Sequence, residues 1–271
     1  MNGKDFLLRE SLGVCYYTCR MFDSVPLLRH GFSTRRGAGP QSDVGSFNLS
    51  NVPWDSPERV SKNRKRFLSA LHLEHAPLIT LRQVHSNRVH IIDDISGQWN
   101  QSEGDSLVTQ IANVALSVQV ADCLPVLIAD PVKQAVAAVH SGWRGTLSGI
   151  LLKTIREMER NFGCNPSTLL AAIGPGIRAC CFEVGPEVAD LFDKAYPGCC
   201  VACSVEERPG KFLLDLVKVL DTQLNLAGVK PEHRSDLSTC TRCNPTEFFS
   251  YRGEGAAAGR MLAVISLSST H

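Results

Sequence analysis

The sequence has 271 residues, of which 44% are hydrophobic and 20% are charged. It contains 28 Lys and Arg against 27 Asp and Glu, so the formal net charge is +1. A chain of this length buries a sizeable core, and its composition excludes a disordered protein. The balanced charge gives no support for nucleic-acid binding or for attraction to an acidic membrane surface.

The N-terminus and the cysteines indicate a cellular compartment. No window approaches the roughly 20 apolar residues of a membrane span. The first ten residues carry charges at Lys4, Asp5 and Arg9, where a signal peptide has its apolar stretch. The eleven cysteines are odd in number and scattered, unlike a secreted disulfide framework. We therefore expect a reduced, cytoplasmic protein with a single α/β domain over residues 1–271.

The N-terminal part of the chain predicts short strands, a loop and a helix. One or two strands are expected within residues 1–28, and residues 29–37 lead into a loop rich in Gly, Pro and Ser. Ser56, Pro57 and Glu58 predict a helix start, with a cap residue, a proline and an acidic residue in the first turn. The buried face of this helix is expected to consist of Val60, Phe67, Leu68 and Leu71.

The central part of the chain places a cysteine and a histidine next to predicted strands. Residues 114–120 and 125–129 predict strands on either side of Cys123, and the second ends where Pro131 stops the ladder. Residues 134–139 predict the next strand, and His140 follows it directly. Side chains at strand ends commonly meet ligands.

Upstream, residues 78–84 and 88–92 predict two strands joined near Ser86, which would place His85 at a hairpin end. Downstream, a helix is expected from Gly145 to about Phe162. A strand that turns through glycine into a helix N-terminus favours anions, and Arg144 would add a formal charge there.

The C-terminal half predicts further alternation of strands and helices. A strand at 169–173 ends in a tight Gly174-Pro175-Gly176 turn, which lacks the last glycine of a dinucleotide fingerprint. The remaining elements are expected to be a helix at 186–195, an irregular loop at 197–210, a helix at 215–227 capped by Asp215 and Gly228, and a strand at 261–267.

Three chemistries are open to Cys123, His140 and His85. Two imidazoles and one thiolate would leave a tetrahedral zinc ion one open position, as in catalytic sites, and bound zinc would activate a water molecule. Alternatively, His140 could activate Cys123 as a nucleophile without any metal. The same donors also suit copper, but a multicopper oxidase needs more than eight histidines, several in His-x-His pairs, which this sequence lacks.

The plain alternative is that Cys123 is a buried apolar residue and that the histidines are ordinary core or surface side chains. The spacings of 38 and 17 residues between the three are no general zinc signature. Composition and spacing therefore predict only a possible metal or thiol site. Cys240 and Cys243 could donate to a second, structural zinc together with the cysteines of 199–203, although a second Cys-x-x-Cys pair is missing.

The order of several motifs makes the chain similar to a known family. It resembles the purine nucleoside phosphorylase family, earlier described as multicopper polyphenol oxidases or laccase-domain proteins. The resemblance extends from about Leu28 to Leu267, and it departs from the family at Ser141 and in the cysteine-rich 199–203 loop. The motifs that show it are residues 29–35, 83–86, 121–125, 139–145, 174–177, 240–241 and 248–252.

The resemblance implies a zinc ion bound by His85, Cys123 and His140. It further implies phosphorolysis of adenosine, inosine, guanosine and methylthioadenosine, with deamination of adenosine as a second activity. The implied fold is a mixed-sheet α/β sandwich related to a toxin deamidase that uses a Cys–His pair. Some bacterial members are also linked to peptidoglycan composition.

Roles for other residues follow as hypotheses. Phosphate needs positive charge, and deamination needs an acid or base, for which Asp122 is a candidate although it would point away from Cys123 in a regular strand. Two other functions stay open, a cysteine-dependent amidohydrolase or deamidase and a non-catalytic zinc protein of envelope quality control. The residues expected at the site are Cys123, His140, Asp122 and Arg144 for catalysis, and Arg35, Asn48, Gln83, Arg252 and Arg260 for substrate and phosphate.

Overall fold

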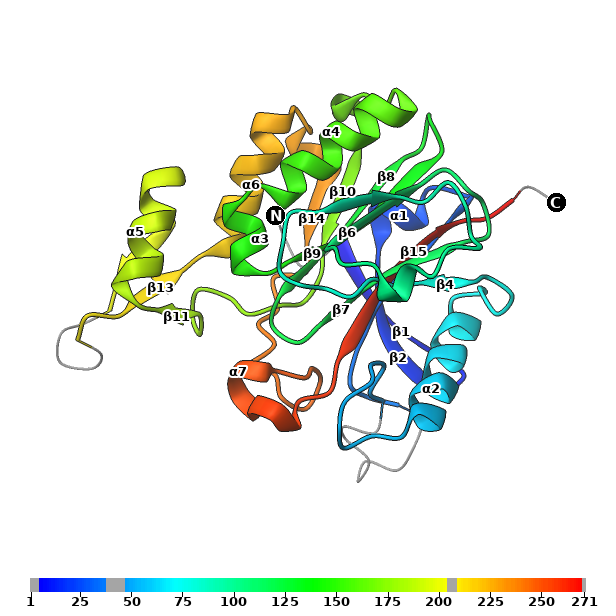
Figure 1. The fold of residues 1–271 in the computed structure, drawn as a ribbon, viewed down its shortest axis with the longest axis horizontal. Coiled ribbons are helices and arrows are strands. Elements are labelled where there is room, and N and C mark those ends of the chain that lie inside the picture. The colour runs from blue at the N-terminus through cyan, green and yellow to red at the C-terminus, as the bar shows by residue number, and fades with distance from the viewer. Residues whose placement is uncertain (1–4, 38–46, 204–208, 270–271) are drawn as a thin grey trace.

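Two six-stranded sheets pack face to face, and helices cover the outer face of each (Figure 1). This computed structural model describes residues 5–37, 47–203 and 209–269. The greater part of the expected Gly, Pro and Ser-rich loop, 38–46, lies outside the described residues. The architecture is therefore a mixed α/β sandwich, as expected, while its relation to the toxin deamidase fold stays a prediction.

The first sheet is antiparallel except at one edge, where β4 runs parallel to β7. Its order is β1 (Phe6–Ser11), β2 (Val14–Cys19), β3 (Leu28–Ser33), β15 (Met261–Leu267), β7 (Ala115–Val120) and β4 (Leu78–Ile79). The second sheet is antiparallel in its centre and parallel at both edges. Its order is β14 (Arg234–Asp236), β10 (Leu170–Ile173), β8 (Leu124–Asp130), β9 (Ala135–Ser141), β6 (Ser106–Thr109) and β5 (Val89–Ile91).

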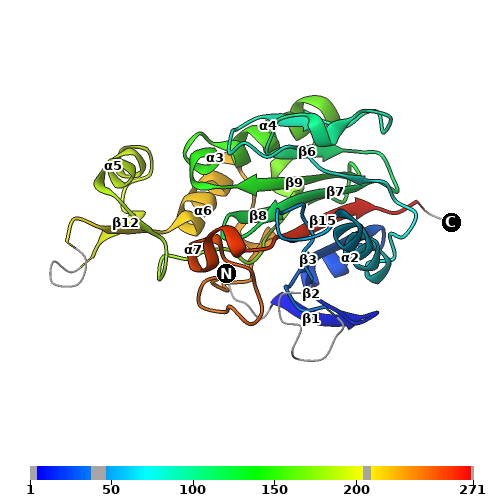
Figure 2. The ribbon, with the colours of Figure 1, turned by 60° about the horizontal axis from the view of Figure 1, so that its bottom comes forward.

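Helix α2 (Pro57–Ala70) covers the first sheet, and α4 (Ile150–Phe162) and α6 (Leu216–Ala227) cover the second (Figure 2). A small sheet of β11 (Glu183–Val184), β13 (Phe212–Leu214) and β12 (Cys200–Ala202) projects to one side with α5 (Pro186–Ala195). The short helical segments are α1 (Arg20–Asp23), α3 (Trp143–Leu147) and α7 (Tyr251–Glu254), with 3-10 turns η3 (Trp99–Gln101), η4 (Pro166–Thr168), η5 (Pro231–His233) and η6 (Gly255–Ala257). None of the described helices has the length and apolar character needed to cross a membrane.

The central strands are apolar on both faces because each face meets a different layer. In β8, Leu127 and Ala129 pack between the two sheets, whereas Val126 and Ile128 pack under the helices. Successive side chains of a strand point to opposite faces, so a strand buried on both sides is apolar throughout. This explains the continuous apolar runs after Cys123 and before His140.

Local signals predicted several elements correctly. The Ser56 side chain caps α2 by accepting a hydrogen bond from the Arg59 amide, and Asp215 caps α6 in the same way through Lys218. Gly228 ends α6 in the left-handed conformation, as expected. The helix at 186–195 and the strand at 261–267 are confirmed.

Three expectations about elements are wrong. The strands on either side of His85 form no hairpin, because β4 pairs with β7 in one sheet and β5 with β6 in the other. The single helix after Gly145 is two helices, α3 and α4, which are interrupted at Gly149 with a φ of +75°. The loop at 197–210 contains strand β12, and residues 204–208 of it lie outside the described residues.

Candidate active site

The donor atoms of His85, Cys123 and His140 lie within 4.8 Å of one another. The Cys123 sulfur is 3.7 Å from Nε2 of His85. The two imidazole rings meet edge to face, with centroids 4.9 Å apart and planes inclined by 79°. The fold thus brings together three side chains that are far apart in the sequence.

Strand pairing positions Cys123 and His140. In the antiparallel pair of β8 and β9, Leu124 lies opposite Ser141 and Pro125 lies opposite His140. Cys123 immediately precedes β8, so its sulfur reaches the end of β9 that carries His140. Both strands are buried along their length, which gives the two side chains a rigid support.

His85 lies in the segment that connects β4 of the first sheet to β5 of the second sheet. Its φ is +58°, in the left-handed region that non-glycine residues rarely adopt. Its backbone N–H donates a hydrogen bond of 3.0 Å to Asp105, and the amide of Ser86 donates one of 2.6 Å to the same carboxylate. Strained backbone of this kind persists where the surroundings fix it, often at functional sites.

Asp105 connects the His85 segment to His140. Its buried carboxylate accepts the two amides and the Ser86 hydroxyl, and it lies 2.8 Å from Nδ1 of His140. A carboxylate at Nδ1 keeps the proton on that nitrogen and leaves Nε2 free as a metal ligand. Sequence reasoning missed Asp105, although an acidic residue directly before a buried apolar strand is a usable signal.

The pKa values show how the three groups interact in the metal-free protein. Burial alone would raise the pKa of Cys123, but His140 and His85 lower it to about 6. Burial alone would lower the pKa of His140, but Cys123 and Asp105 raise it to about 9. At neutral pH the metal-free site therefore holds a thiolate beside an imidazolium ion.

Two positions in the 139–145 motif require glycine, because atoms of neighbouring residues lie where a Cβ would stand. A Cβ added to Gly142 would lie 2.7 Å from Cδ2 of His85 and 3.1 Å from Sγ of Cys123. A Cβ added to Gly145 would lie 2.8 Å from the carbonyl oxygen of Ser86. Any side chain at Gly142 would therefore displace a donor group.

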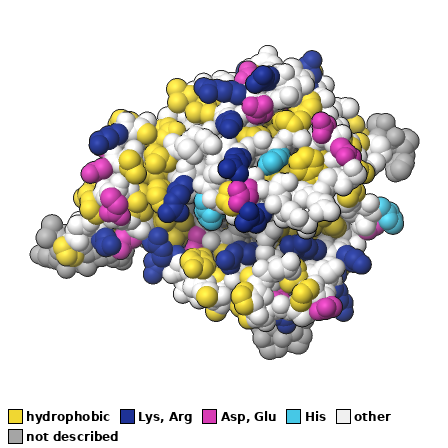
Figure 3. Space-filling model, in the orientation of Figure 1, with side chains coloured by type: hydrophobic (Ala, Val, Ile, Leu, Met, Phe, Trp, Pro, Cys, Tyr) yellow, Lys and Arg dark blue, Asp and Glu magenta, His cyan; other side chains and the backbone are white. Residues whose placement is uncertain are grey.

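The three side chains line a cavity of about 660 Å³. The volume lies within the usual range for small-ligand sites. Arg64, Gln83 and Arg260 also line it, so the cavity combines candidate metal donors with cationic and amide groups. On the face drawn in Figure 3, Lys and Arg side chains gather across the middle of the molecule with acidic side chains between them.

Residues 29–268 match the family model described as multi-copper polyphenol oxidoreductase laccase. The chain belongs to this family. This confirms the resemblance of the motifs to the laccase-domain proteins. A purine nucleoside phosphorylase of Deinococcus radiodurans is 38% identical over 251 residues, which are 90% of this chain and 93% of that protein.

Other relatives of this laccase-domain chain agree. The protein named adenosine deaminase RL5, from an unknown prokaryotic organism, is 35% identical over 237 residues, or 84% of this chain and 90% of that one. The crystal structure of YlmD from Geobacillus stearothermophilus superimposes with a TM-score of 0.84 at 29% identity, covering 98% of this chain and 99% of that chain. The mixed α/β fold is thus shared with this solved structure.

Two of the expected substrate residues of this laccase-domain chain line the cavity. The Gln83 amide exchanges two hydrogen bonds with the backbone of Gln119, so it fixes the segment before His85 against β7. Arg260 donates from Nη1 to the carbonyl oxygens of Ala258 and Gly259. Arg64 was missed by sequence reasoning; its Nε donates to the carbonyl of Leu49, and burial lowers its pKa.

Arg35 and Asn48 lie among other partners and do not line the cavity. Arg35 forms an ion pair of 3.0 Å with Glu254 and stacks over the Phe249 ring. Asn48 is fully buried; its amide nitrogen donates to Asp55 and its amide oxygen accepts from the backbone N–H of Arg260. Both side chains therefore stabilise loops.

Arg144, Arg252 and Asp122 are likewise not among the lining residues. Arg144 is exposed over the ring of Trp143, and α3 is only five residues long. The guanidinium of Arg252 donates to the carbonyl of Glu183. Asp122 precedes β8 with a φ of +90°, so the expected strand alternation does not apply to it. Its carboxylate accepts hydrogen bonds from Thr241 and from the Arg252 amide, both of 2.6 Å.

The expected grouping of Cys240 and Cys243 with the 199–203 cysteines is wrong. Cys240 and Cys243 lie beside Cys180 and Cys181, which follow the 174–177 turn. Cys199 and Cys200 contact each other instead, with their sulfurs 3.9 Å apart in the small lateral sheet region. The prediction paired cysteine groups that are closer in the sequence. In the structure, the turn after β10 folds back onto the loop after β14.

Proposed function

We propose that this protein is a zinc-dependent purine nucleoside phosphorylase that cleaves adenosine, inosine, guanosine and methylthioadenosine, with adenosine deamination as a second activity. The observation that carries the proposal is the juxtaposition of His85, Cys123 and His140 on a nucleoside-sized cavity that also holds arginines. Relatives named purine nucleoside phosphorylase and adenosine deaminase support it. We further propose a cytoplasmic location, since all eleven cysteines are free thiols.

The donor set fits a catalytic zinc ion. Three protein ligands of imidazole and thiolate type leave a fourth position for water or substrate. Asp105 fixes the tautomer of His140, which is the usual outer-shell support of a metal-bound histidine. Gly142 leaves the space between His85 and Cys123 unfilled. Multicopper chemistry needs more ligands than the eight histidines of the sequence provide, so we assign zinc despite the family name.

When bound, zinc would act as a Lewis acid and lower the pKa of a water molecule at its open position. The chain's own residues supply the rest. In phosphorolysis a phosphate oxygen bonds to C1′ as the bond from C1′ to the purine nitrogen breaks, and negative charge leaves with the base. Arg64 and Arg260 would hold the phosphate against the sugar by charge, and Asp105 would keep His140 oriented throughout.

A second candidate function has one observation in its favour. The lowered pKa of Cys123 beside a raised pKa of His140 is the arrangement of a cysteine nucleophile, as in a cysteine-dependent amidohydrolase or deamidase. The two candidates differ in their response to reagents. Sensitivity to chelators, together with resistance of the metal-loaded protein to iodoacetamide, would exclude the cysteine mechanism.

The test is chromatographic product analysis of adenosine incubated with the zinc-loaded protein, with and without phosphate. We expect adenine and ribose 1-phosphate only when phosphate is present. Inosine should form under both conditions and, with phosphate, should be cleaved further to hypoxanthine and ribose 1-phosphate. The Cys123→Ala variant should form none of these products, while Cys203→Ser should behave as the wild type. Inosine alone would restrict the function to deamination, and no turnover by fully metal-loaded protein would contradict both activities.

A further inference from the structure

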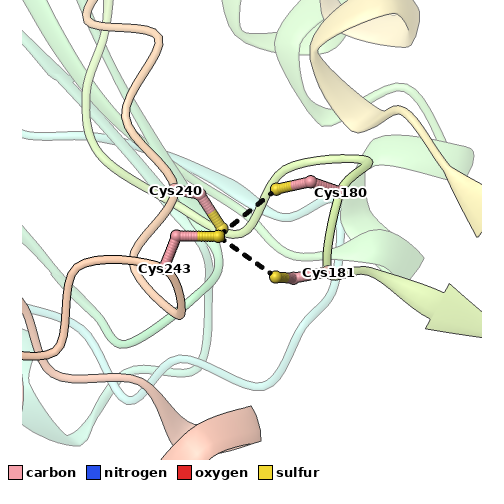
Figure 4. Close-up of side chains that lie close together, drawn as sticks. All are labelled: Cys180, Cys181, Cys240 and Cys243. Atoms are coloured by element: carbon pink, nitrogen blue, oxygen red, sulfur yellow. Dashed lines mark hydrogen bonds between the residues drawn. The ribbon is translucent and has the colours of Figure 1, made fainter.

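A second group of metal-type donors consists of Cys180, Cys181, Cys240 and Cys243 (Figure 4). Cys180 and Cys181 lie between β10 and β11, and Cys240 and Cys243 lie in the loop that follows β14. Figure 4 shows the four side chains converging from these two loops. None of the four lines the cavity described above, so the candidate active site does not account for them.

The sulfur spacing fits a shared ion better than a disulfide. Cys243 Sγ lies 3.3 Å from Cys181 Sγ and 3.6 Å from Cys180 Sγ, and all four sulfurs lie within 4.8 Å of one another. A zinc–sulfur bond of about 2.3 Å places the sulfurs of a tetrahedral site about 3.8 Å apart. A disulfide requires about 2.05 Å. Closing any one disulfide would leave two thiols of the group without a role.

Backbone hydrogen bonds hold the two loops in this arrangement. The Thr241 amide donates to the Gly176 carbonyl at 3.1 Å, and the Gly176 amide donates to the Thr239 carbonyl at 3.4 Å, which forms a parallel bridge between Gly176 and Cys240. An ion pair of 2.8 Å also joins Arg178, in the loop between β10 and β11, to Asp236, the last residue of β14. The fold therefore already holds the four sulfurs near the spacing that a shared ion requires.

We propose that Cys180, Cys181, Cys240 and Cys243 bind one Zn²⁺ ion in an all-sulfur, structural site. Four protein ligands leave no position for water or substrate, which is typical of structural zinc. Thiolate ligands select soft or borderline metals. Because the four sulfurs are close enough to share a single ion, a cluster of several iron atoms does not fit between them. The proposal is independent of the proposed function.

The site would fasten the segment that precedes Cys123. Thr241, next to Cys240, donates its hydroxyl to the carboxylate of Asp122 at 2.6 Å. Ile177, from the other loop, donates its amide to the Asp122 carbonyl at 2.7 Å. Both cysteine-bearing loops thus hold the residue that adjoins Cys123. An ion between them would stabilise the fold and the position of Cys123 without contacting the substrate.

The test is zinc stoichiometry by elemental mass spectrometry on the full chain purified from zinc-supplemented cells. We expect two zinc ions per wild-type chain and one in the His85→Ala/Cys123→Ala variant, which keeps only the four-cysteine group. The Cys240→Ser/Cys243→Ser variant should also hold one ion, and the control Cys200→Ser should hold two. X-ray absorption at the zinc edge of His85→Ala/Cys123→Ala should show only sulfur neighbours at about 2.3 Å.

Absence of zinc from His85→Ala/Cys123→Ala would overturn the proposal, as would nitrogen or oxygen neighbours in its absorption spectrum. Iron in place of zinc, or a disulfide within the group found by non-reducing peptide mapping, would also overturn it. If Cys240→Ser/Cys243→Ser fails to fold, the absorption measurement on His85→Ala/Cys123→Ala still tests the proposal, because that variant retains all four cysteines. Adenosine turnover is not part of the readout, so failure of this proposal is distinguishable from failure of the proposed function.

Discussion

The two cysteine-containing donor groups differ in ligand type, ligand number and surroundings. His85, Cys123 and His140 offer two nitrogens and one sulfur and line a cavity of about 660 Å³. The group of Cys180, Cys181, Cys240 and Cys243 offers four sulfurs and lines no part of that cavity. Three ligands with an open position allow chemistry, whereas four ligands close the coordination sphere. The comparison separates a group suited to catalysis from one suited to holding loops together.

The groups also differ in how the chain supports them. Strand pairing of β8 with β9 and the buried carboxylate of Asp105 position the first group, so it should remain in place without metal. The second joins two loops through a few backbone hydrogen bonds, so its ion should contribute more to stability. Removing one ion should therefore abolish activity, and removing the other should mainly lower the melting temperature.

The largest expected effect on activity is that of Cys123→Ala. Losing a proposed metal ligand should reduce turnover of adenosine by more than about 100-fold, the upper figure for loss of an outer-shell partner. Thermal unfolding of the metal-free protein should change little, because the neighbouring strands are buried along their whole length. Steady-state kinetics measures the turnover of adenosine, and calorimetry measures thermal unfolding. Activity within a few fold of the wild type would contradict the assignment of this group as the catalytic one.

Asp105→Asn should reduce activity by about 10 to 100-fold. Both carboxylate oxygens of Asp105 accept hydrogen bonds, whereas an asparagine offers one acceptor oxygen and an NH2 group. The NH2 group would therefore face other donors, and the contact that holds the tautomer and orientation of His140 would be weakened. Zinc titration should show weaker binding at one site while the all-sulfur site is unchanged. Equal loss of zinc from both sites would mean that the substitution disturbs the fold generally, against the role given to Asp105.

Cys240→Ser/Cys243→Ser should lower the melting temperature by roughly 10 °C, since loss of a tightly bound ligand removes about 4 kcal/mol at a thousandfold excess over Kd. Activity well below the melting temperature should fall less than in Asp105→Asn. Differential scanning calorimetry with excess zinc measures the shift, with Cys200→Ser as the matched control. A melting temperature equal to that of the wild type would remove the distinction between the two groups.

The smallest expected effect is a selectivity in alkylation of the metal-free protein. With its pKa lowered to about 6, Cys123 is mostly thiolate at pH 7, while Cys181, with a pKa raised to about 11, is mostly thiol. Iodoacetamide should therefore label Cys123 first, and its rate should decline as the pH falls through 6. Peptide mass spectrometry after short exposure measures this. Faster labelling of Cys181 would reverse the predicted order.

Signals confined to a few residues made much of the fold predictable. Ser56, Asp215 and Gly228 act on the helix turn next to them, and the apolar run after Cys123 is a strand whichever strand it pairs with. The hairpin at His85 was wrong because pairing partners are decided over long distances. There β4 and β5 pair with strands of different sheets, which no local pattern reveals.

The candidate site was likewise predictable only in part. The grouping of His85, Cys123 and His140 came from resemblance to a family, because their spacing has no general meaning. Of the charged residues expected at the site, Arg260 lines the cavity. Arg35 is paired with Glu254 instead, and Arg144 lies exposed over Trp143. The place of Asp105 before a strand marks it in the sequence, but its contact with His140 depends on the tertiary fold. The proximity of Cys181 to Cys243 likewise depends on tertiary contacts that the sequence does not show.

The most direct test of the account is anomalous diffraction at the zinc edge from crystals of the zinc-loaded protein. We expect two peaks per chain. One should lie between Nε2 of His140, the His85 ring and the Cys123 sulfur, with its fourth position facing the cavity and no fourth protein ligand. The other should lie at the centre of Cys180, Cys181, Cys240 and Cys243. A first site without zinc, or with its cavity side closed by a fourth protein ligand, would contradict the account.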